Sequence, residues 1–375
     1  MLDASMSVDF LHDFVHIYWP SARSVRVGGD PVAGYHVGPF LLLELLPFAY
    51  LPLAPAKWLW FAGSIFEVYV GSRIAESLLG RCAPRAVYAV LGLALLSSVM
   101  VLDSLLMGQL GVLASLAVLA CLWLLREEGG RDYEAGIVLG LGIAVKPTWG
   151  VWLLLFLLLR RYRALGAALA TLALSLVLPA LFLGIDTTIR ITQLSFERCL
   201  ELRATIANAG ASQHFAHVVQ RWLSHAYGSD ASDVAARLAV LRPLSLGLFV
   251  LGVGWTLGSA LRRKRAMDPL SAAVAVATLM PFAVPTSWPL DFTVLPFLQA
   301  ATLARILDIR AQMSRRRYAS CLALVAASLL LSNVLLRYVT AAASDLGGAV
   351  LLAQIAIAVA CFSCVTSVAA RVRPA

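Results

Sequence analysis

The sequence predicts an all-α polytopic membrane protein, and three of its properties lead to that fold class. Of its 375 residues, 60% are hydrophobic and only 14% are charged, whereas a soluble domain carries about a quarter charged residues. The apolar residues form long Leu/Ala/Val runs, not the alternating pattern of barrel strands. The net charge of +9 lies largely in short arginine clusters between these runs, so it gives no reason to expect a nucleic-acid partner.

A helix needs about 20 residues to cross the hydrocarbon core of a bilayer. Runs near that length predict about nine full spans, at residues 57–79, 85–102, 110–125, 164–185, 238–261, 269–286, 290–308, 318–338 and 347–370. We expect one membrane domain over 1–375. Its successive parts are an external and juxtamembrane loop (1–56), a transmembrane core (57–185), an external loop (186–237) and C-terminal transmembrane helices (238–375).

Two apolar pieces are too short to span. Residues 133–145 and 148–160 flank Lys146-Pro147, and at 1.5 Å per residue each would be about 20 Å long. Proline ends a helix by removing a hydrogen-bond donor and clashing with the preceding turn. This pattern predicts a hairpin of two half-length helices with Lys146 at its tip.

The arginine clusters indicate the orientation. With the spans above they all fall on one face, which the positive-inside rule makes cytoplasmic. The clusters are Arg81/Arg85, Arg126/Arg131, Arg160/Arg161/Arg163, Arg262/Arg263/Lys264/Arg265, Arg310/Arg315/Arg316/Arg317 and Arg371/Arg373. All six histidines then fall on the other face, which we expect to be the external, working face.

Residues 39–53 are the one ambiguous apolar segment. They contain Glu44 and are interrupted by Pro47 and Pro52, so a straight spanning helix is not expected. We interpret the segment as a surface-lying or re-entrant part of an external N-terminal platform. Because residues 1–35 are then external without a preceding helix, we expect a leading transmembrane helix to be missing from this sequence.

Asp13 is the candidate catalytic group of the N-terminal platform. A carboxylate beside aromatic residues at the lipid–water boundary is desolvated, which raises its pKa and suits it to act as a general base. The alternative is a solvated aspartate beside Tyr18 and Trp19 as interface anchors. Asp9 is a rival, and so is Asp30, although Gly29-Asp30-Pro31 has the composition of a turn.

Two further regions hold candidate polar groups. In the expected loop 103–109, Gln109 could contact substrate, while Asp103 could simply cap a helix. An intramembrane lysine such as Lys146 indicates an anionic partner, for which the start of the next half-helix would offer N–H groups; its alternative is a side chain that reaches to the interface.

The long external loop, residues 186–237, supplies the remaining candidates. Arg198 and Arg203 could pair with phosphate, and His214 or His217 could move a proton or bind a sugar hydroxyl. Their alternative is an amphipathic helix lying on lipid headgroups. Trp288, just before a span, could anchor at the interface or stack on a sugar.

The order of these residues resembles glycosyltransferase family 87, a family of polyprenol-phosphate-sugar-dependent, often mannosyl, transferases of the GT-C superfamily. The residues that carry the resemblance are Asp13, Tyr18, Ala22, Gly29-Asp30-Pro31, Tyr35, Pro39, Gly108-Gln109, Ala135-Gly136, Lys146-Pro147, Arg160 to Arg163 and Ser287-Trp288. The resemblance implies a GT-C-like bundle in which Asp13 is catalytic and Lys146-Pro147 lies at the donor phosphate.

Other site residues also follow from the resemblance. The family's Asn-Gln-Ser stretch corresponds to Ser212-Gln213-His214, with two of its three residues replaced, and its arginine corresponds to Arg221. Together with the reasoning above, this gives a predicted site. Asp13 is catalytic; Lys146, Arg198 and Arg203 bind the donor phosphate; substrate contacts come from His16, Tyr18, Gln109, Gln213, His214, Arg221 and Trp288.

The predicted activity is that of an inverting, metal-independent hexosyltransferase, with mannose as the expected sugar and no cofactor. The expected partners are a polyprenyl-phosphate sugar, a lipid or glycan acceptor and membrane lipids, at the external face of a bacterial plasma membrane. Two alternatives stay open: a flippase or transporter of lipid-linked sugars, and a polysaccharide polymerase or ligase that uses a lipid-diphosphate donor.

Overall fold

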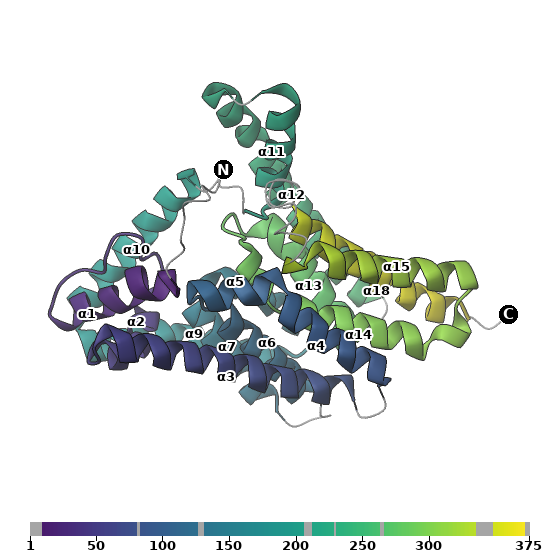
Figure 1. Cartoon of the computed structure of the whole chain (residues 1–375), viewed down its shortest axis with the longest axis horizontal. Helices are drawn as coiled ribbons and strands as arrows, with labels where there is room; N and C mark the ends of the chain where they lie inside the picture. The colour runs from purple at the N-terminus through teal and green to yellow at the C-terminus, as the bar shows by residue number, and fades with distance from the viewer. Residues whose placement is uncertain are drawn as a thin grey trace. The chain divides into compact units, whose positions relative to one another are not determined.

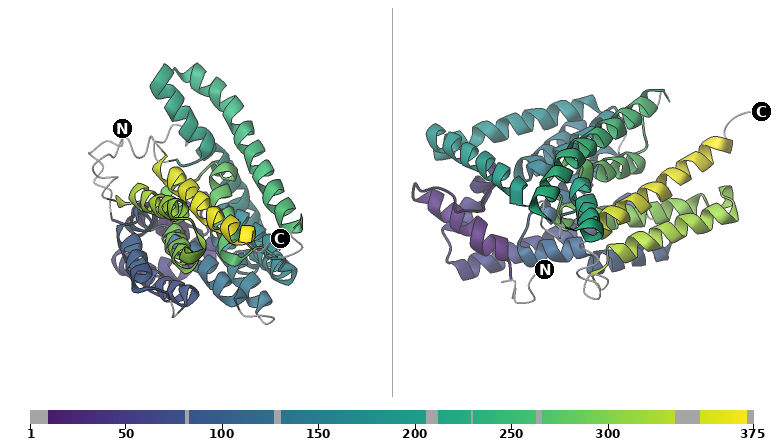
Figure 2. Two further views of the ribbon diagram at one scale, coloured as in Figure 1. Left: turned by 90° about the vertical axis from the view of Figure 1, so that its right-hand side faces the viewer. Right: turned by 90° about the horizontal axis from the view of Figure 1, so that it is seen from above.

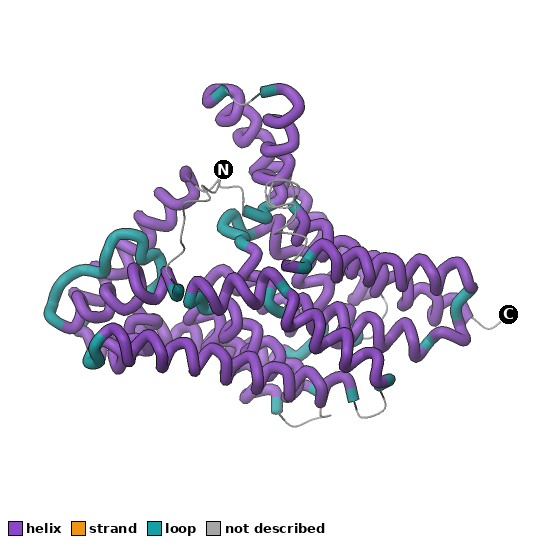
Figure 3. The backbone as a smooth tube through the Cα atoms, in the orientation of Figure 1, coloured by secondary structure: helices purple, strands orange, loops and turns teal. Residues whose placement is uncertain are grey.

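The protein is described here from a computed structural model, which describes residues 10–80, 83–126, 131–205, 212–228, 230–262, 266–334 and 348–371; the side chains of 203–205, 231 and 365–371 are not described. Within these residues the secondary structure is helical apart from turns and one isolated bridge (Figure 3). The all-α fold class is therefore confirmed. The chain divides into two compact units, and the division falls within three of the described helices, α3 (Leu53–Leu79), α5 (Val99–Met107) and α8 (Leu153–Leu158).

The first unit comprises Met1–Ile74, Asp103–Leu153 and Arg161–Ala207. Its elements, with α3 and α5 extending past the division, are η1 (Phe14–Tyr18), α1 (Trp19–Arg26), α2 (Pro39–Ala49), α3 (Leu53–Leu79), α5 (Val99–Met107), α6 (Gly111–Leu125), α7 (Asp132–Val145), η2 (Pro147–Trp152), α9 (Tyr162–Leu183) and α10 (Ile185–Thr205).

Three helices of this unit, α6, α7 and α9, lie side by side (Figure 1). The glycines of α7 allow this close approach. A Cβ on Gly140 would lie 2.9 Å from the Ala168 carbonyl oxygen of α9, and one on Gly142 would lie 2.5 Å from the Ala117 Cβ of α6. Small residues at helix contacts are the usual means by which membrane helices pack. The unit thus supplies a rigid base on which α7 ends at a fixed place.

The N-terminal platform, residues 10–49, has an apolar core of its own. Phe14, Tyr18 and Tyr35 are almost fully buried together with Leu41 and Leu45 of α2. At about 1.5 Å per residue, the 11 residues of α2 are too short to cross a bilayer. The interpretation of 39–53 as a non-spanning segment agrees with this length.

The second unit comprises Ala75–Leu102, Leu154–Arg160 and Asn208–Ala375. Its elements are α4 (Arg85–Ser97), α8 (Leu153–Leu158), α11 (Phe215–Tyr227), α12 (Ala231–Arg262), α13 (Pro269–Ala283), η4 (Pro289–Phe292), α14 (Leu295–Asp308), η5 (Arg310–Gln312), α15 (Arg315–Leu331) and α18 (Ala349–Arg371). The helices α15 and α18 lie side by side in light green and yellow (Figure 2).

The predicted spans are confirmed only in part. Among the described residues, three helical segments are long and apolar enough to cross a membrane: Tyr162–Leu183, Ser232–Arg262 and Pro289–Asp308. Others are apolar but shorter, at 10–17 residues, so the structure does not confirm nine full spans. The chain is a helical membrane protein, and the detailed span count stays a prediction.

Two expected boundaries were wrong. The span expected at 85–102 is broken at Ser98, whose extended backbone bridges Asn333 in the same unit. A new helix, α5, then continues through Asp103 to Met107, so the polar connection expected over 103–109 shrinks to Gly108-Gln109-Leu110. In the expected external loop 186–237, the described residues are largely helical, in α10 and α11, as the amphipathic-helix alternative allowed; its external position stays a prediction.

Candidate active site

The approach to Asp13 is set by an unusual backbone conformation at Leu11. Its φ is +63°, a region that costs a non-glycine residue roughly 1–2 kcal/mol. The Leu11 side chain is fully buried, and its N–H donates to the Leu106 carbonyl at 2.7 Å. Burial and this bond hold Leu11 in place, so the chain enters η1 with Asp13 directed at the end of α5.

The turn between α5 and α6 is also fixed by specific contacts. Gly108 has φ +70°, and a Cβ there would lie 3.0 Å from the Phe14 Cβ. The Trp60 indole donates to the Gly108 carbonyl at 3.1 Å and stacks on the Phe14 ring with centroids 4.9 Å apart. These contacts require glycine at 108 and place the next residue, Gln109, beside η1.

Asp13, Gln109 and Tyr18 form a chain of hydrogen bonds. The Tyr18 hydroxyl donates to Gln109 Oε1 at 3.0 Å, which leaves the amide nitrogen of Gln109 to donate to Asp13 Oδ2. Because Tyr18 orients the amide, the carboxylate receives a donor and not a second acceptor. The structure shows that Gln109 contacts Asp13 and that Tyr18 contacts Gln109. The substrate contacts predicted for Tyr18 and Gln109 stay a prediction.

The surroundings of Asp13 shift its pKa in opposite directions. The side chain is only 8% exposed, and this burial raises the pKa of the carboxyl above its ordinary value. The Gln109 hydrogen bond and the charges of His12, His36 and Lys146 act in the other direction. The carboxyl is therefore a stronger base than a solvated aspartate, while nearby donors keep the ionised form accessible.

Lys146 lies where α7 ends. Its φ and ψ of −133° and 85° leave the helical region, so the helix break predicted from Lys146-Pro147 is confirmed. The second half is not one α-helix but the 3₁₀ helix η2 followed by α8. The Lys146 side chain is 9% exposed and its charge acts on Asp13, so in the first unit the predicted phosphate ligand lies within electrostatic range of the predicted base.

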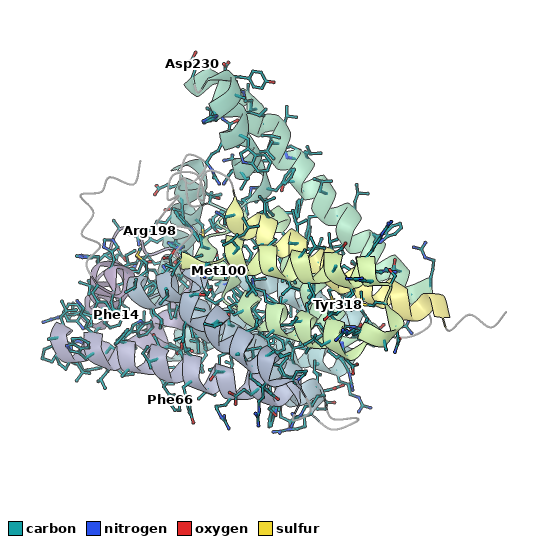
Figure 4. The ribbon with its side chains drawn as sticks, turned by 45° about the vertical axis from the view of Figure 1, so that its right-hand side comes forward. Phe14, Phe66, Met100, Arg198, Asp230 and Tyr318 are labelled. Atoms are coloured by element: carbon teal, nitrogen blue, oxygen red, sulfur yellow. The ribbon has the colours of Figure 1, made fainter. Side chains whose placement is uncertain are left out.

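Arg198 of α10, labelled in Figure 4, is hydrogen-bonded to the loop that joins α1 to α2. Its guanidinium donates to the carbonyls of Val32 at 2.8 Å, Pro31 at 3.0 Å and Tyr35 at 3.3 Å. These bonds give it a structural role, and phosphate binding by Arg198 stays a prediction. The side chain of Arg203 lies outside the described residues. His16 is exposed and packs on the His12 ring at 4.7 Å.

In the second unit, Ser212 is the centre of a buried polar cluster. Its hydroxyl and His217 Nδ1 are hydrogen-bonded at 2.9 Å, and its carbonyl accepts from Arg221 at 2.6 Å. Ser212 and His217 are fully buried, and Arg221 is 8% exposed. Burial, followed by the charges of nearby groups, lowers the pKa of His217 to about 3, so the ring is neutral at neutral pH.

Two more predicted contacts adjoin this cluster. The Gln213 N–H donates to the Ser287 carbonyl at 2.6 Å and its Oε1 accepts from the Leu351 N–H at 3.3 Å. His214 Nε2 lies 3.4 Å from the Ser245 hydroxyl. Gln213, His214 and Arg221 thus lie together inside the second unit. Trp288 is the N-cap residue of η4, and its backbone N–H donates to Asp291 Oδ2 at 2.8 Å.

Sequence reasoning missed the groups that hold these residues. Ser212 entered only as part of the stretch Ser212-Gln213-His214, without a role of its own. Leu11 and Trp60 carry no recognisable motif, and a left-handed leucine leaves no signal in the sequence. Gly108 did leave one, because a glycine directly before a polar residue between two apolar runs indicates a tight turn. Among the described residues, no group of three or more carboxylates, histidines and cysteines could hold a metal ion. Metal independence of the reaction stays a prediction.

Comparison with known proteins gives one family. The model of glycosyltransferase family 87 matches residues 35–285. The chain is also similar to the alpha-(1->3)-arabinofuranosyltransferase of Mycobacterium tuberculosis, in the strains H37Rv and CDC 1551, with 32% identity over 140 residues in each case. That region is 37% of this chain and 32% of each relative, so the chain matches about a third of their length. No solved structure matches.

The His217 pKa predicts a pH-dependent stability. An unfolded histidine titrates near 6.5 and the folded one near 3, so between these values the unfolded state binds more protons and stability falls as pH falls. From pH 6.5 to 5 the loss is about 2 kcal/mol at 1.36 kcal/mol per unit. Denaturation of the wild type and His217→Gln at both pH values measures it, and the substitution should remove the loss.

The control for this prediction is His225→Gln, which changes an exposed histidine on the same helix, α11. It should keep the wild-type slope. An equal slope in His217→Gln and the wild type would contradict the assignment of the pH dependence to the buried ring.

Proposed function

The chain belongs to glycosyltransferase family 87, and we propose that it transfers a sugar from a polyprenyl-phosphate donor to a hydroxyl of a lipid or glycan acceptor. The observation that carries this proposal is the buried Asp13 carboxylate, held by Gln109 and subject to the charge of Lys146 within one unit. Reaction at the external face of a bacterial plasma membrane is supported by the arginine clusters, which favour a cytoplasmic position for the opposite loops.

The proposed reaction is a single displacement with inversion at the anomeric carbon. Asp13 removes the proton from the acceptor hydroxyl as that oxygen bonds to the anomeric carbon. The bond from the anomeric carbon to the phosphate oxygen breaks, and its electron pair leaves with the polyprenyl phosphate. Lys146 stabilises the charge that gathers on this leaving group. The products are a glycoside, the lipid phosphate and protonated Asp13, and no metal is needed.

The sugar is open between two classes. The resemblance favours mannose, whereas the matched relatives are named arabinofuranosyltransferases and favour a pentofuranose. Both are carried as lipid-linked donors in this proposal, and the chemistry at Asp13 is the same for each. Activity assays therefore need both donors, in vesicles, where a new glycosidic product indicates an enzyme and translocation without product indicates a flippase.

Replacement of Asp13 by Asn should lower kcat by about 10²–10⁴, the usual contribution of a general base. The isosteric amide cannot take the acceptor proton, but donor binding should persist. The measurement is sugar transfer from the lipid-phosphate donor, beside direct binding of that donor. Asp30→Asn is the matched control because this half-exposed aspartate pairs with Arg190 at 3.0 Å. Wild-type transfer by Asp13→Asn would refute Asp13 as the base.

Gln109 and Tyr18 are positioning residues in this scheme, and the pH profile tests that role. Because the Gln109 hydrogen bond lowers the pKa of Asp13, Gln109→Ala should raise it. The base must be ionised, so the acid limb of kcat/KM should move to higher pH. Tyr18→Phe should move it in the same direction by less, since the tyrosine acts through Gln109. A change in rate at all pH values with an unmoved limb would show that neither side chain tunes Asp13.

A further inference from the structure

The segment that follows Lys146 carries an arrangement that the reaction above does not use. Residues Pro147–Trp152 form a 3₁₀ helix, which has three residues per turn, so side chains three apart lie in line. Lys146 is the residue at its N-cap, and Trp149 and Trp152 follow at steps of three. The side chains of Trp149 and Trp152 therefore lie in line. Together with Lys146, which directly precedes the helix, we call them the Lys–Trp row.

The two tryptophans of the Lys–Trp row are deeply buried and parallel. Trp149 is 1% exposed and Trp152 is 0% exposed, with ring centroids 5.9 Å apart and planes inclined by 21°. Both indole Nε1 atoms are buried without a hydrogen-bond partner among the described residues, and so is the hydroxyl of the neighbouring Thr148. A buried donor left unsatisfied destabilises the folded protein.

Packing alone does not require these donors. Phenylalanine would fill much of the same volume and leave no unsatisfied N–H, whereas an indole N–H only donates. The missing partners are therefore acceptors. The positive charge of Lys146 at the head of the row attracts negative charge, so it favours an acceptor that is also an anion. Phosphate oxygens meet both requirements, because one phosphate can accept several hydrogen bonds.

We propose that the Lys–Trp row binds the phosphate group of a polyprenyl phosphate, with the indole N–H groups of Trp149 and Trp152 as donors to its oxygens. The identity of the phosphate as that of the sugar donor rests on the proposed function. The row starts at the residue whose charge acts on Asp13, so a phosphate bound there would place the attached sugar on the side of the carboxylate. Trp149 and Trp152 thereby become substrate-binding residues.

The test compares the wild type with Trp149→Phe and Trp152→Phe, which keep an aromatic ring and remove the N–H. The probes are a polyprenyl phosphate without sugar, the corresponding polyprenol and the sugar-loaded lipid phosphate, each titrated calorimetrically onto the full chain in lipid nanodiscs. A hydrogen bond to a charged group is worth about 1.5–3 kcal/mol, so each variant should bind polyprenyl phosphate about tenfold or more weakly. Polyprenol binding should not change.

The matched control is Trp255→Phe, which alters a tryptophan that is 72% exposed and should leave all three affinities unchanged. Thermal unfolding of each variant shows that it remains folded. If a variant does not fold, 3-benzothienylalanine at the same position replaces the N–H by sulfur with the ring shape retained, and it should weaken binding in the same way. Undiminished binding of polyprenyl phosphate by folded variants would overturn the proposal, and so would equal weakening of phosphate and polyprenol.

The three probes also separate this proposal from the proposed function. Weakening seen only with the sugar-loaded lipid would overturn phosphate as the ligand, because the indoles would then contact sugar hydroxyls. A wild type that binds polyprenyl phosphate through the row but transfers no sugar would support this inference and refute the transferase. Normal transfer and normal donor affinity in both variants would support the transferase and refute phosphate binding by the Lys–Trp row.

Discussion

Burial of the Asp13 carboxylate is the constraint on which the candidate site depends. A buried carboxylate is costly unless donors and a nearby cation compensate it. Here the compensation is divided, because Gln109 supplies a hydrogen bond and Lys146 supplies charge. A solvated aspartate would be a weaker base, and an uncompensated one would stay protonated, so the same surroundings that stabilise Asp13 also make it useful.

The scaffold explains why these groups can meet. The left-handed Leu11 and the glycine turn at Gly108 fix two short segments at which the backbone reverses. The close packing of α7 against its neighbours fixes the point where Lys146 leaves the helix. Catalytic precision in a helical membrane protein must come from such interruptions, because regular helices in lipid satisfy their own backbone groups and offer none to a substrate. The buried Ser212 cluster in the second unit is a further polar interruption of the same kind.

Much of this arrangement could be predicted from the sequence, where local chemistry decides the outcome. The proline after Lys146 favours a helix break at that point, and Pro39 begins α2 and Pro52 lies beyond its end, whereas Pro47 lies inside it. The order of Asp13 and Gly108-Gln109 pointed to the residues that the structure joins. The sequence failed where tertiary contacts decide: the break at Ser98 depends on pairing with Asn333, and Arg198 binds carbonyls more than 160 residues away. The sequence predicted an apolar half-helix after Pro147, and the alignment of Trp149 with Trp152 followed only from the 3₁₀ geometry.

The most direct measurement of the central claim is the pKa of Asp13 itself. Carboxyl signals from ¹³C-labelled aspartate can be assigned to Asp13 by their loss in Asp13→Asn, and then titrated in the wild type and in Lys146→Gln. An ordinary aspartate has a pKa near 3.9. The account predicts a higher pKa for Asp13 in the wild type, and a further rise when the Lys146 charge is removed. A pKa at or below the ordinary value, or one that Lys146→Gln leaves unchanged, would contradict it.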